Sequence, residues 1–441
     1  MALMALIALI AFAALVAAVT PVTPLWRPLR RSHRAVGLFC RTMPAMSSSA
    51  LPASGSPRLH GLDTLRAAAI VLVFAYHYQV FVSGEATFGW LSRIGWAGVD
   101  LFFVLSGYLI ANQLLGGMRR GEQLSLPRFY GRRLLRTLPN FYVVLALYWL
   151  FPQVLGGREP PPLWRFLTFT QNIGLTPGTA FSHAWSLCIE EQFYLLLPAA
   201  LMLGAAMKSG RRALAWSLIG VLTVAAVLWR DHLWSRYGTQ DPSLGYYPHL
   251  YYGSLARLDE FLPGVAVALL KQGHPSIWSA LMARARTLLA VGAAAALGML
   301  TLMLHLYYID GYGYGRAMSS WGYSALAWSF ALLVMASMAP AGVLARVKVP
   351  GANALARWSY ALYLTHKPIA YALLQPLAAM GLMRASGWAI PVITATCLLG
   401  GWLLYRVVEV PFLGWRDRWI PSQFTDAARA TTTAQRSPQH A

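Results

Sequence analysis

Ten apolar stretches of about 20 residues follow one another along this chain of 441 residues. Since about 20 helical residues span the hydrocarbon core of a bilayer, each stretch predicts a transmembrane helix. The composition agrees, because 57% of the residues are hydrophobic and only 12% are charged. We therefore expect an all-α polytopic membrane protein with about ten transmembrane helices. The predicted spans are 66–82, 94–115, 138–155, 185–207, 213–229, 250–270, 287–306, 321–340, 358–379 and 387–408.

The basic residues alternate in density between successive connections, as real spans require. Of the 36 Lys and Arg residues, 27 fall on one side of the ten-span arrangement and seven on the other. Because basic loops stay in the cytoplasm, both ends of the core are expected there, with the protein in the cytoplasmic (inner) membrane. The net charge of +21 is then a topology signal. We expect contacts with membrane lipids and none with nucleic acid.

Residues 1–20 form a further apolar run, and the basic cluster Arg27, Arg30, Arg31 and Arg34 follows it. A cleaved signal peptide carries its positive charge in front of the apolar run, and none is found there. Three interpretations stay open: an extra helix with its N-terminus outside, a start codon set too early, and a signal peptide. Residues 40–57 are rich in Ser and Pro and predict a linker.

Ionisable side chains inside the predicted spans are the main indication of a site. Each costs several kcal/mol in hydrocarbon unless it is paired or faces a polar cavity. They come from five spans at similar predicted depth, so we expect the helices to surround a polar intramembrane cavity. A purely structural network of buried ion pairs is the alternative. These residues are His77, Asp100, Glu190, Glu191, Arg257, Asp259, Glu260, His366 and Lys367.

His77 is the candidate catalytic residue. Asp63 is expected to cap the first core helix, and Arg66 and His77 then share one face, about 16 Å apart along the helix. This arrangement puts a cation at the cytoplasmic mouth and an imidazole near the middle of the bilayer. Imidazole suits both proton transfer and acyl transfer near neutral pH. The alternative is an Arg at the interface and a core His bonded to a neighbouring helix.

Two carboxylates are candidate partners of that imidazole. The second and fourth spans enter from outside, so Asp100 and Glu190 are expected at a depth comparable to that of His77. Glu190 and Glu191 point about 100° apart on a helix, so at most one of them should face the cavity. We expect Glu190 to be that residue, with Asp100 as the alternate partner.

The basic connection before the third span is a candidate anion site. Arg133 and Arg136 are three residues apart, so they face together on a helix. Together with Arg66 they lie on the predicted cytoplasmic side and could bind phosphate groups. The alternative is that they only set topology and contact lipid headgroups. Cys40, Cys188 and Cys397 lie far apart, and the sequence predicts no disulfide framework and no metal site.

Five motifs occur in order on these spans, and together they resemble the membrane-bound acyltransferase-3 family over about residues 58–412. Thr64 departs from the family pattern, which usually has Gly there, and this affects helix entry more than chemistry. The motifs are Leu62-Asp63-Thr64-Leu65-Arg66 followed by His77, Gly98-Val99-Asp100 through Ser106-Gly107-Tyr108, Arg132-Arg133 with Arg136 and Pro139, Trp185-Ser186 with Glu190 and Tyr194, and Ser359-Tyr360 with Tyr363 and His366.

The resemblance implies an O-acyltransferase that moves an acyl group, usually acetyl, from cytoplasmic acyl-CoA to a hydroxyl of a carbohydrate or glycolipid acceptor. The acceptor stays open among lipopolysaccharide, exopolysaccharide, peptidoglycan precursors and small glycosylated metabolites. Catalytic roles then fall to His77, Glu190 and Asp100, and CoA binding falls to Arg66, Arg133 and Arg136. Acceptor binding is expected of Arg257, Asp259, Tyr363 and His366. No metal is implied.

The resemblance also suggests three parts: residues 1–57 as an N-terminal hydrophobic segment and linker, 58–412 as the membrane domain, and 413–441 as a cytoplasmic tail. Two other classes of protein compete with an enzyme. A proton-coupled transporter also uses buried His and carboxylates, but basic residues at the mouth of the His-bearing helix favour an anionic co-substrate. A membrane scaffold without activity leaves the clustered charges unexplained.

Overall fold

The computed structural model describes residues 60–206, 210–309, 313–384 and 386–425. The expectations for residues 1–57 lie outside this part.

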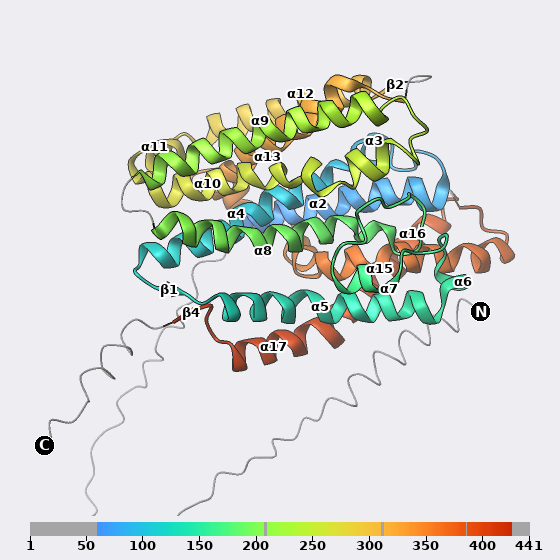
Figure 1. Cartoon of the computed structure of the whole chain (residues 1–441). Helices are drawn as coiled ribbons and strands as arrows, with labels where there is room; N and C mark the ends of the chain where they lie inside the picture. Colours follow the sequence, from blue (N-terminus) through green and yellow to red (C-terminus); the bar gives the residue numbers. More distant parts are fainter. Residues whose placement is uncertain (1–59, 207–209, 310–312, 385, 426–441) are drawn as a thin grey trace, which may run out of the picture.

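Figure 1 shows long helices side by side in one bundle, with α9 and α12 along one flank, α5 and α17 along the other, and α2, α4 and α8 between them. The α-helices are α2 (His60–Tyr78), α3 (Trp90–Ile94), α4 (Ala97–Arg119), α5 (Leu126–Leu150), α6 (Pro152–Leu155), α7 (Leu163–Leu167), α8 (Trp185–Ala206), α9 (Arg211–Tyr237), α10 (Leu262–Gly273), α11 (Pro275–Ala283), α12 (Ala285–Leu306), α13 (Tyr323–Met338), α14 (Val343–Arg346), α15 (Ala352–Ala379), α16 (Ala389–Leu404) and α17 (Val410–Trp419).

Seven helical segments in the described residues are long and apolar enough to cross a membrane. Some include π-helical or 3₁₀ turns continuous with an α-helix, namely η1 (Gln79–Ser83), η2 (Ser182–Ala184), η6 (Met318–Gly322) and η7 (Tyr405–Glu409). The chain is therefore an all-α multi-pass membrane protein. The seven segments are His60–Ser83, Ala97–Arg119, Ser182–Gly204, Arg211–Tyr237, Ala285–Leu306, Met318–Met338 and Ala389–Trp419.

Two further predicted spans, 138–155 and 358–379, correspond to α5 and α15, which have 25 and 28 residues. Both are long enough for a bilayer, but they carry the basic residues and histidines of the sequence motifs, which lower their hydropathy. Helix α5 begins at Leu126, so the arginines that the sequence placed in a connection before residue 138 lie on a helix. Likewise Asp63, expected as a helix cap, lies within the first turn of α2.

The predicted continuous span 250–270 is wrong, because the structure breaks it. A π-helical turn, η3 (Tyr247–Tyr251), and two 3₁₀ turns, η4 (Ser254–Ala256) and η5 (Leu258–Phe261), precede α10, which has 12 residues. Gly253 separates η3 from η4, and Pro263 lies in the first turn of α10. Irregular backbone is tolerated at membrane depth where it is buried in protein, and this break holds buried charged residues described below.

Close helix packing fixes α4 against its neighbours. Helix α4 packs on α2 and α10, while α15 packs on α2 and α16. At the α4–α10 crossing, a Cβ on Gly107 would lie 2.2 Å from the carbonyl oxygen of Phe261, and one on Gly264 would lie 2.1 Å from that of Val104. Small residues let membrane helices approach closely, so this contact depends on the two glycines.

Short strands tie connections together at the ends of the bundle. Strand β1 (Gln123–Leu124) pairs antiparallel with β4 (Phe424–Thr425), and β2 (Tyr308–Ile309) pairs with β3 (Gly313–Tyr314). The tail boundary proposed after residue 412 falls inside α17, which packs on α5. The first part of the expected tail is therefore attached to the helical bundle.

Candidate active site

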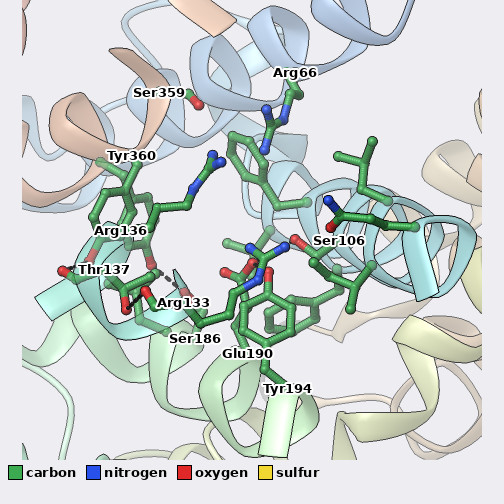
Figure 2. Close-up of a pocket in the computed structure, with 18 of the residues that line it drawn as sticks. Arg66, Ser106, Arg133, Arg136, Thr137, Ser186, Glu190, Tyr194, Ser359 and Tyr360 are labelled. Carbon is green, nitrogen blue, oxygen red and sulfur yellow. Dashed lines mark hydrogen bonds between the residues drawn. The ribbon is translucent and has the colours of Figure 1, made fainter. Parts of the chain in front are cut away.

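A cavity of about 450 Å³ lies between α2, α4, α5, α8 and α15. We call it the arginine pocket, because it is lined by Arg66, Arg133, Arg136 and Arg357, together with Glu190 and neutral side chains. Figure 2 shows the Arg66 and Arg136 side chains reaching into it from two different walls, with Arg133 beside Glu190. Several cations facing one cavity give it the chemistry of an anion site.

The arginines of helix α5 have two kinds of partner. Arg133 and Arg136 line the arginine pocket, as their spacing predicts. Arg128 instead donates to the carbonyl oxygen of Phe424, and Arg132 pairs with Asp417 in α17 at 3.2 Å. Arginines of one helix therefore serve the pocket in two cases and hold the segment that follows the last span in the two others.

Glu190 is held on the wall of the arginine pocket by two hydroxyls. Ser106 donates to its Oε1 at 2.6 Å, and Tyr194 donates to the same oxygen. The Arg133 guanidinium lies 4.7 Å from the centroid of the Tyr194 ring, so the carboxylate and this cation share a neighbour. The Nε of Arg66 is buried and has no hydrogen-bond partner among the residues that the structure describes. These cations therefore keep capacity for a ligand.

His77 forms a pair with His366. His77 Nδ1 and His366 Nε2 lie 2.6 Å apart, and the two rings are almost parallel. The other nitrogen of His366, Nδ1, is 2.9 Å from the carbonyl oxygen of Leu362, which can only accept. His366 Nδ1 therefore carries a proton, and its Nε2 accepts one from His77 Nδ1 when both rings are neutral. In this state His77 Nε2 is the unprotonated, basic nitrogen.

His77 lines a second cavity, of about 340 Å³, which we call the histidine pocket. Its wall also includes His183 and many aromatic rings, and no Asp, Glu, Lys or Arg side chain lines it in the part of the chain that the structure describes. This cavity is therefore suited to a neutral ligand with apolar faces and hydroxyl groups. The aromatic lining residues are Tyr76, Phe81, Trp96, Trp185, Tyr247, Tyr251 and Tyr252.

Tyr363 lies between the two cavities. It lines the arginine pocket, while its ring centroid is 6.0 Å from that of His366 and 6.5 Å from that of His77. Its hydroxyl donates to the carbonyl oxygen of His183 and accepts from Ser186 at 2.6 Å. Val99 lines both cavities. The arginine and histidine pockets therefore share a thin wall next to the histidine pair.

Other predicted site residues form closed ion pairs. Arg257 pairs with Asp100 at 3.1 Å and with Glu260, and all three side chains are fully buried. Asp259 pairs with Arg230 at 2.6 Å, also out of contact with solvent. The Tyr323 ring covers Arg257, with the guanidinium carbon 3.9 Å from the ring centroid. None of these five charged residues lines either pocket.

The structure thus divides the predicted site into three groups. Arg66, Arg133 and Arg136 lie together with Glu190 in the arginine pocket, and Glu191 does not line it. His77, His366 and Tyr363 lie together at the wall. Asp100 and Arg257 form an ion pair, and Asp259 belongs to another. The expectation that the carboxylates of Asp100 and Glu190 surround His77 is not met, since each bonds to other partners.

Sequence inspection missed two residues near the site, His183 and Arg230, and it placed Lys367 among the intramembrane ionisable residues without predicting its contacts. His183 precedes the Trp185-Ser186 motif by two residues, which was a usable signal. Arg230 was counted with an outer connection, but it is completely buried in α9. Lys367 is buried and donates to Ser182 at 3.1 Å, which ties the segment before α8 to α15. Among the described residues, no group of three or more His, Cys, Asp or Glu is arranged to hold a metal ion.

A polytopic helical bundle with an arginine-lined cavity next to a histidine pair holds groups that are suited to group transfer in a membrane protein. Residues 59–406 match the family model described as an acyltransferase domain, and the chain belongs to this family. The match covers the arginine pocket and the histidine pair.

Three of the similar proteins illustrate what the chain resembles. The chain is 30% identical over 377 residues to the "Putative peptidoglycan O-acetyltransferase YrhL" of Bacillus subtilis, covering 80% of this chain and 54% of that protein. It is 35% identical over 224 residues to the peptidoglycan O-acetyltransferase OatA of Listeria monocytogenes, covering 47% of this chain and 33% of that protein. It is 37% identical over 160 residues to the O-acetyltransferase OatA of Staphylococcus aureus, covering 32% and 25%.

The chain spans at most about half the length of these relatives. No solved structure matches it.

Proposed function

We propose that this protein is a membrane O-acetyltransferase that moves an acetyl group from acyl-CoA to a hydroxyl of a cell-envelope carbohydrate. One observation carries the proposal: an arginine-lined pocket and an uncharged aromatic pocket approach the His77–His366 pair from two sides. His77 lines the aromatic pocket, and Tyr363, whose ring lies next to both histidines, lines the arginine pocket. Membership of the acyltransferase family and the names of the relatives support it. They favour group transfer over proton-coupled transport, which the sequence left open.

The arginine pocket is the proposed donor site. The phosphates of CoA would bind Arg66, Arg133 and Arg136, whose guanidinium groups offer paired donors to phosphate oxygens. Glu190, fixed by Ser106 and Tyr194, would orient these cations. In the topology that we propose, the basic connections face the cytoplasm, and the arginine pocket would open to that side, where acyl-CoA is available.

The histidine pair supplies the base. We propose that His77 Nε2 takes the proton of the acceptor hydroxyl while the hydroxyl oxygen attacks the thioester carbonyl carbon. When the tetrahedral intermediate collapses, the C–S bond breaks and the proton on His77 passes to the departing CoA sulfur. The products are an ester and the free thiol of CoA. His366 acts as a positioning residue, because it holds the His77 tautomer that leaves Nε2 basic.

The histidine pocket is the proposed acceptor site. Aromatic rings present flat apolar faces, and His77 presents a hydrogen-bonding nitrogen, a combination that suits a sugar ring. The absence of a charged wall among the described lining residues would disfavour a second anionic ligand. We propose an envelope polysaccharide as the acceptor, as the names of the relatives suggest for them.

The buried ion pairs would hold this arrangement in place. Arg257 and Asp100 connect the irregular segment before α10 to α4, and Asp259 connects it to Arg230 of α9. Tyr251 and Trp185, which lie against Arg257, also line the histidine pocket. We therefore propose that Asp100, Arg257 and Asp259 act through the shape of the acceptor site.

Mass spectrometry of envelope glycans tests the function. Cells that express the intact protein should gain acetyl esters on a glycan, and cells that express His77→Ala at equal membrane level should not. Purified protein in lipid should release CoA from acetyl-CoA only when the glycan is added. Unchanged acetylation with and without the protein, together with no acetyl-CoA binding, would contradict the proposal.

A further inference from the structure

His183 is a buried histidine at the histidine pocket for which the mechanism above has no use. Its side chain is 2% exposed, and it lines the pocket together with His77. The ring centroids of His77 and His183 are 6.3 Å apart, and the ring planes are nearly perpendicular. A ligand that reaches His77 therefore also comes close to His183.

Helix α15 holds both the side chain and the backbone of His183. Its Nε2 lies 3.2 Å from the carbonyl oxygen of Leu364, and its own carbonyl oxygen accepts from Tyr363. The preceding residue, Ser182, accepts from Lys367. Phe181, which is buried, adopts a positive φ of 57° and turns the chain into this segment. The ring is therefore held in one orientation before any ligand binds.

The hydrogen bond of Nε2 decides the chemistry of the other ring nitrogen. A carbonyl oxygen only accepts, so Nε2 carries a proton, and Nδ1 of the neutral ring is an acceptor. Nδ1 is buried and has no hydrogen-bond partner in the part of the chain that the structure describes. An unpaired acceptor in a buried site costs free energy that a donor on the ligand would recover.

The donor for Nδ1 has to be a group other than the reacting hydroxyl. That hydroxyl carries one proton, which goes to His77 Nε2 in the proposed reaction. We propose that His183 Nδ1 accepts a hydrogen bond from a second hydroxyl of the carbohydrate, next to the one that is acylated. This inference rests on the proposed function, and it narrows the acceptor to sugars with two neighbouring free hydroxyls.

Two substitutions separate this role from a structural one. In His183→Gln the side-chain amide can replace Nε2 and keep the bond to Leu364, while the acceptor at the Nδ1 position is lost. In His183→Asn the amide oxygen can replace Nδ1, while the bond to Leu364 is lost. A purely structural role predicts that the Gln variant is active and the Asn variant impaired. The proposal predicts that only the Gln variant loses selection for the second hydroxyl.

The experiment uses the full chain in lipid, labelled acetyl-CoA, and methyl glycosides of glucose, galactose and N-acetylglucosamine. Each glycoside is compared with analogues that lack one hydroxyl. We expect wild-type kcat/KM to fall about 10-fold for one analogue whose missing hydroxyl is next to the acylated position. His183→Gln should be about 10-fold slower on the parent sugar and no slower on that analogue. His305→Gln, on the exposed side of α12, is the matched control and should behave as wild type.

Equal wild-type rates on every singly deoxygenated analogue that retains the acylated hydroxyl would overturn the inference and leave the transferase function intact. So would a His183→Gln variant that keeps the wild-type preference. If the wild-type protein binds acetyl-CoA but transfers to none of the glycosides, the carbohydrate acceptor site itself fails, and this inference fails with it.

Discussion

The arginine pocket and the histidine pocket share a wall but differ completely in charge. Four arginines and one glutamate line the first, whereas the second is lined by aromatic rings, two histidines and small or apolar residues. Helices α2, α4 and α8 contribute to each, but the arginine pocket is completed by α5 and α15, and the histidine pocket mainly by η1, η2, η3 and connections. The two pockets therefore differ both in lining chemistry and in the segments that complete them.

The arginines themselves show a second contrast. Arg230 and Arg257 are completely buried, and each is paired with a carboxylate within the protein. Arg66, Arg133 and Arg136 are only partly buried, and none of them forms an ion pair within 4 Å among those found in the described residues. A cation that keeps its hydrogen-bonding capacity can bind a ligand, whereas one already paired stabilises the fold.

Replacing His77, which lies next to the wall between the pockets, should have the largest effect on the transfer rate. His77→Ala should lower the transfer rate on the order of 10²- to 10⁴-fold, because the general base is lost. Acetyl-CoA binding, measured by calorimetry on the protein in lipid, should stay at the wild-type value, because the donor site is the other pocket. Substantial transfer by this variant would remove His77 from the mechanism.

His366 should have the next largest effect, and the effect should depend on the replacement. His366→Ala removes the acceptor that holds the His77 tautomer, so we expect kcat to fall about 100-fold with little change in KM for either substrate. His366→Gln can place an amide oxygen near the position of Nε2 and should recover part of this loss. If the Ala and Gln variants are equally impaired, His366 does not act through hydrogen bonding to His77.

The arginine pocket should control donor affinity alone. Arg133→Ala and Arg136→Ala should each raise the Kd for acetyl-CoA about 10-fold, because a charged hydrogen bond to phosphate is lost. The KM for the acceptor should not change. Arg128→Ala is the control on the same helix, since this side chain donates to the carbonyl oxygen of Phe424 and does not line the arginine pocket. If Arg133→Ala and Arg136→Ala bind acetyl-CoA as tightly as Arg128→Ala does, these arginines do not bind the donor and only set the membrane topology.

The smallest effect on activity is expected at the closed ion pair. In Asp100→Asn the buried Arg257 loses one of its charged partners. The free energy of unfolding, measured in a thermal unfolding assay, should therefore fall on the order of 3 kcal/mol. The folded fraction should still transfer acetyl groups within about twofold of the wild-type rate. The control is Asp231→Asn, which breaks an exposed pair with Arg316 and should not change stability. A stable Asp100→Asn protein without activity would instead place this carboxylate in the chemistry.

The sequence by itself determined the class of fold and the identity of the main polar residues. Hydropathy is a local property, so the apolar runs indicated a polytopic helical protein, and seven of the predicted spans coincide with apolar helices long enough to cross a membrane. The i,i+3 spacing of Arg133 and Arg136 was enough to place both on one face, because α5 is a regular helix there. Helical periodicity also predicted that at most one of Glu190 and Glu191 faces the cavity, and the motif around Trp185 and Tyr194 selected Glu190, which lines it.

The tertiary structure decided which polar residues meet. Depth estimates put His77, Asp100 and Glu190 in one layer, but depth does not specify rotation about the helix axis or the neighbouring helix. Only the packing of α15 on α2 brings His366 to His77, 289 residues away in sequence. The break before α10 could not be predicted from the sequence either. Arg257 is tolerated at this depth because Asp100 and Glu260 neutralise it, and the pairing with Asp100 is a tertiary contact. Contacts between residues far apart in the chain set the partners, and a pattern read along one helix does not contain them.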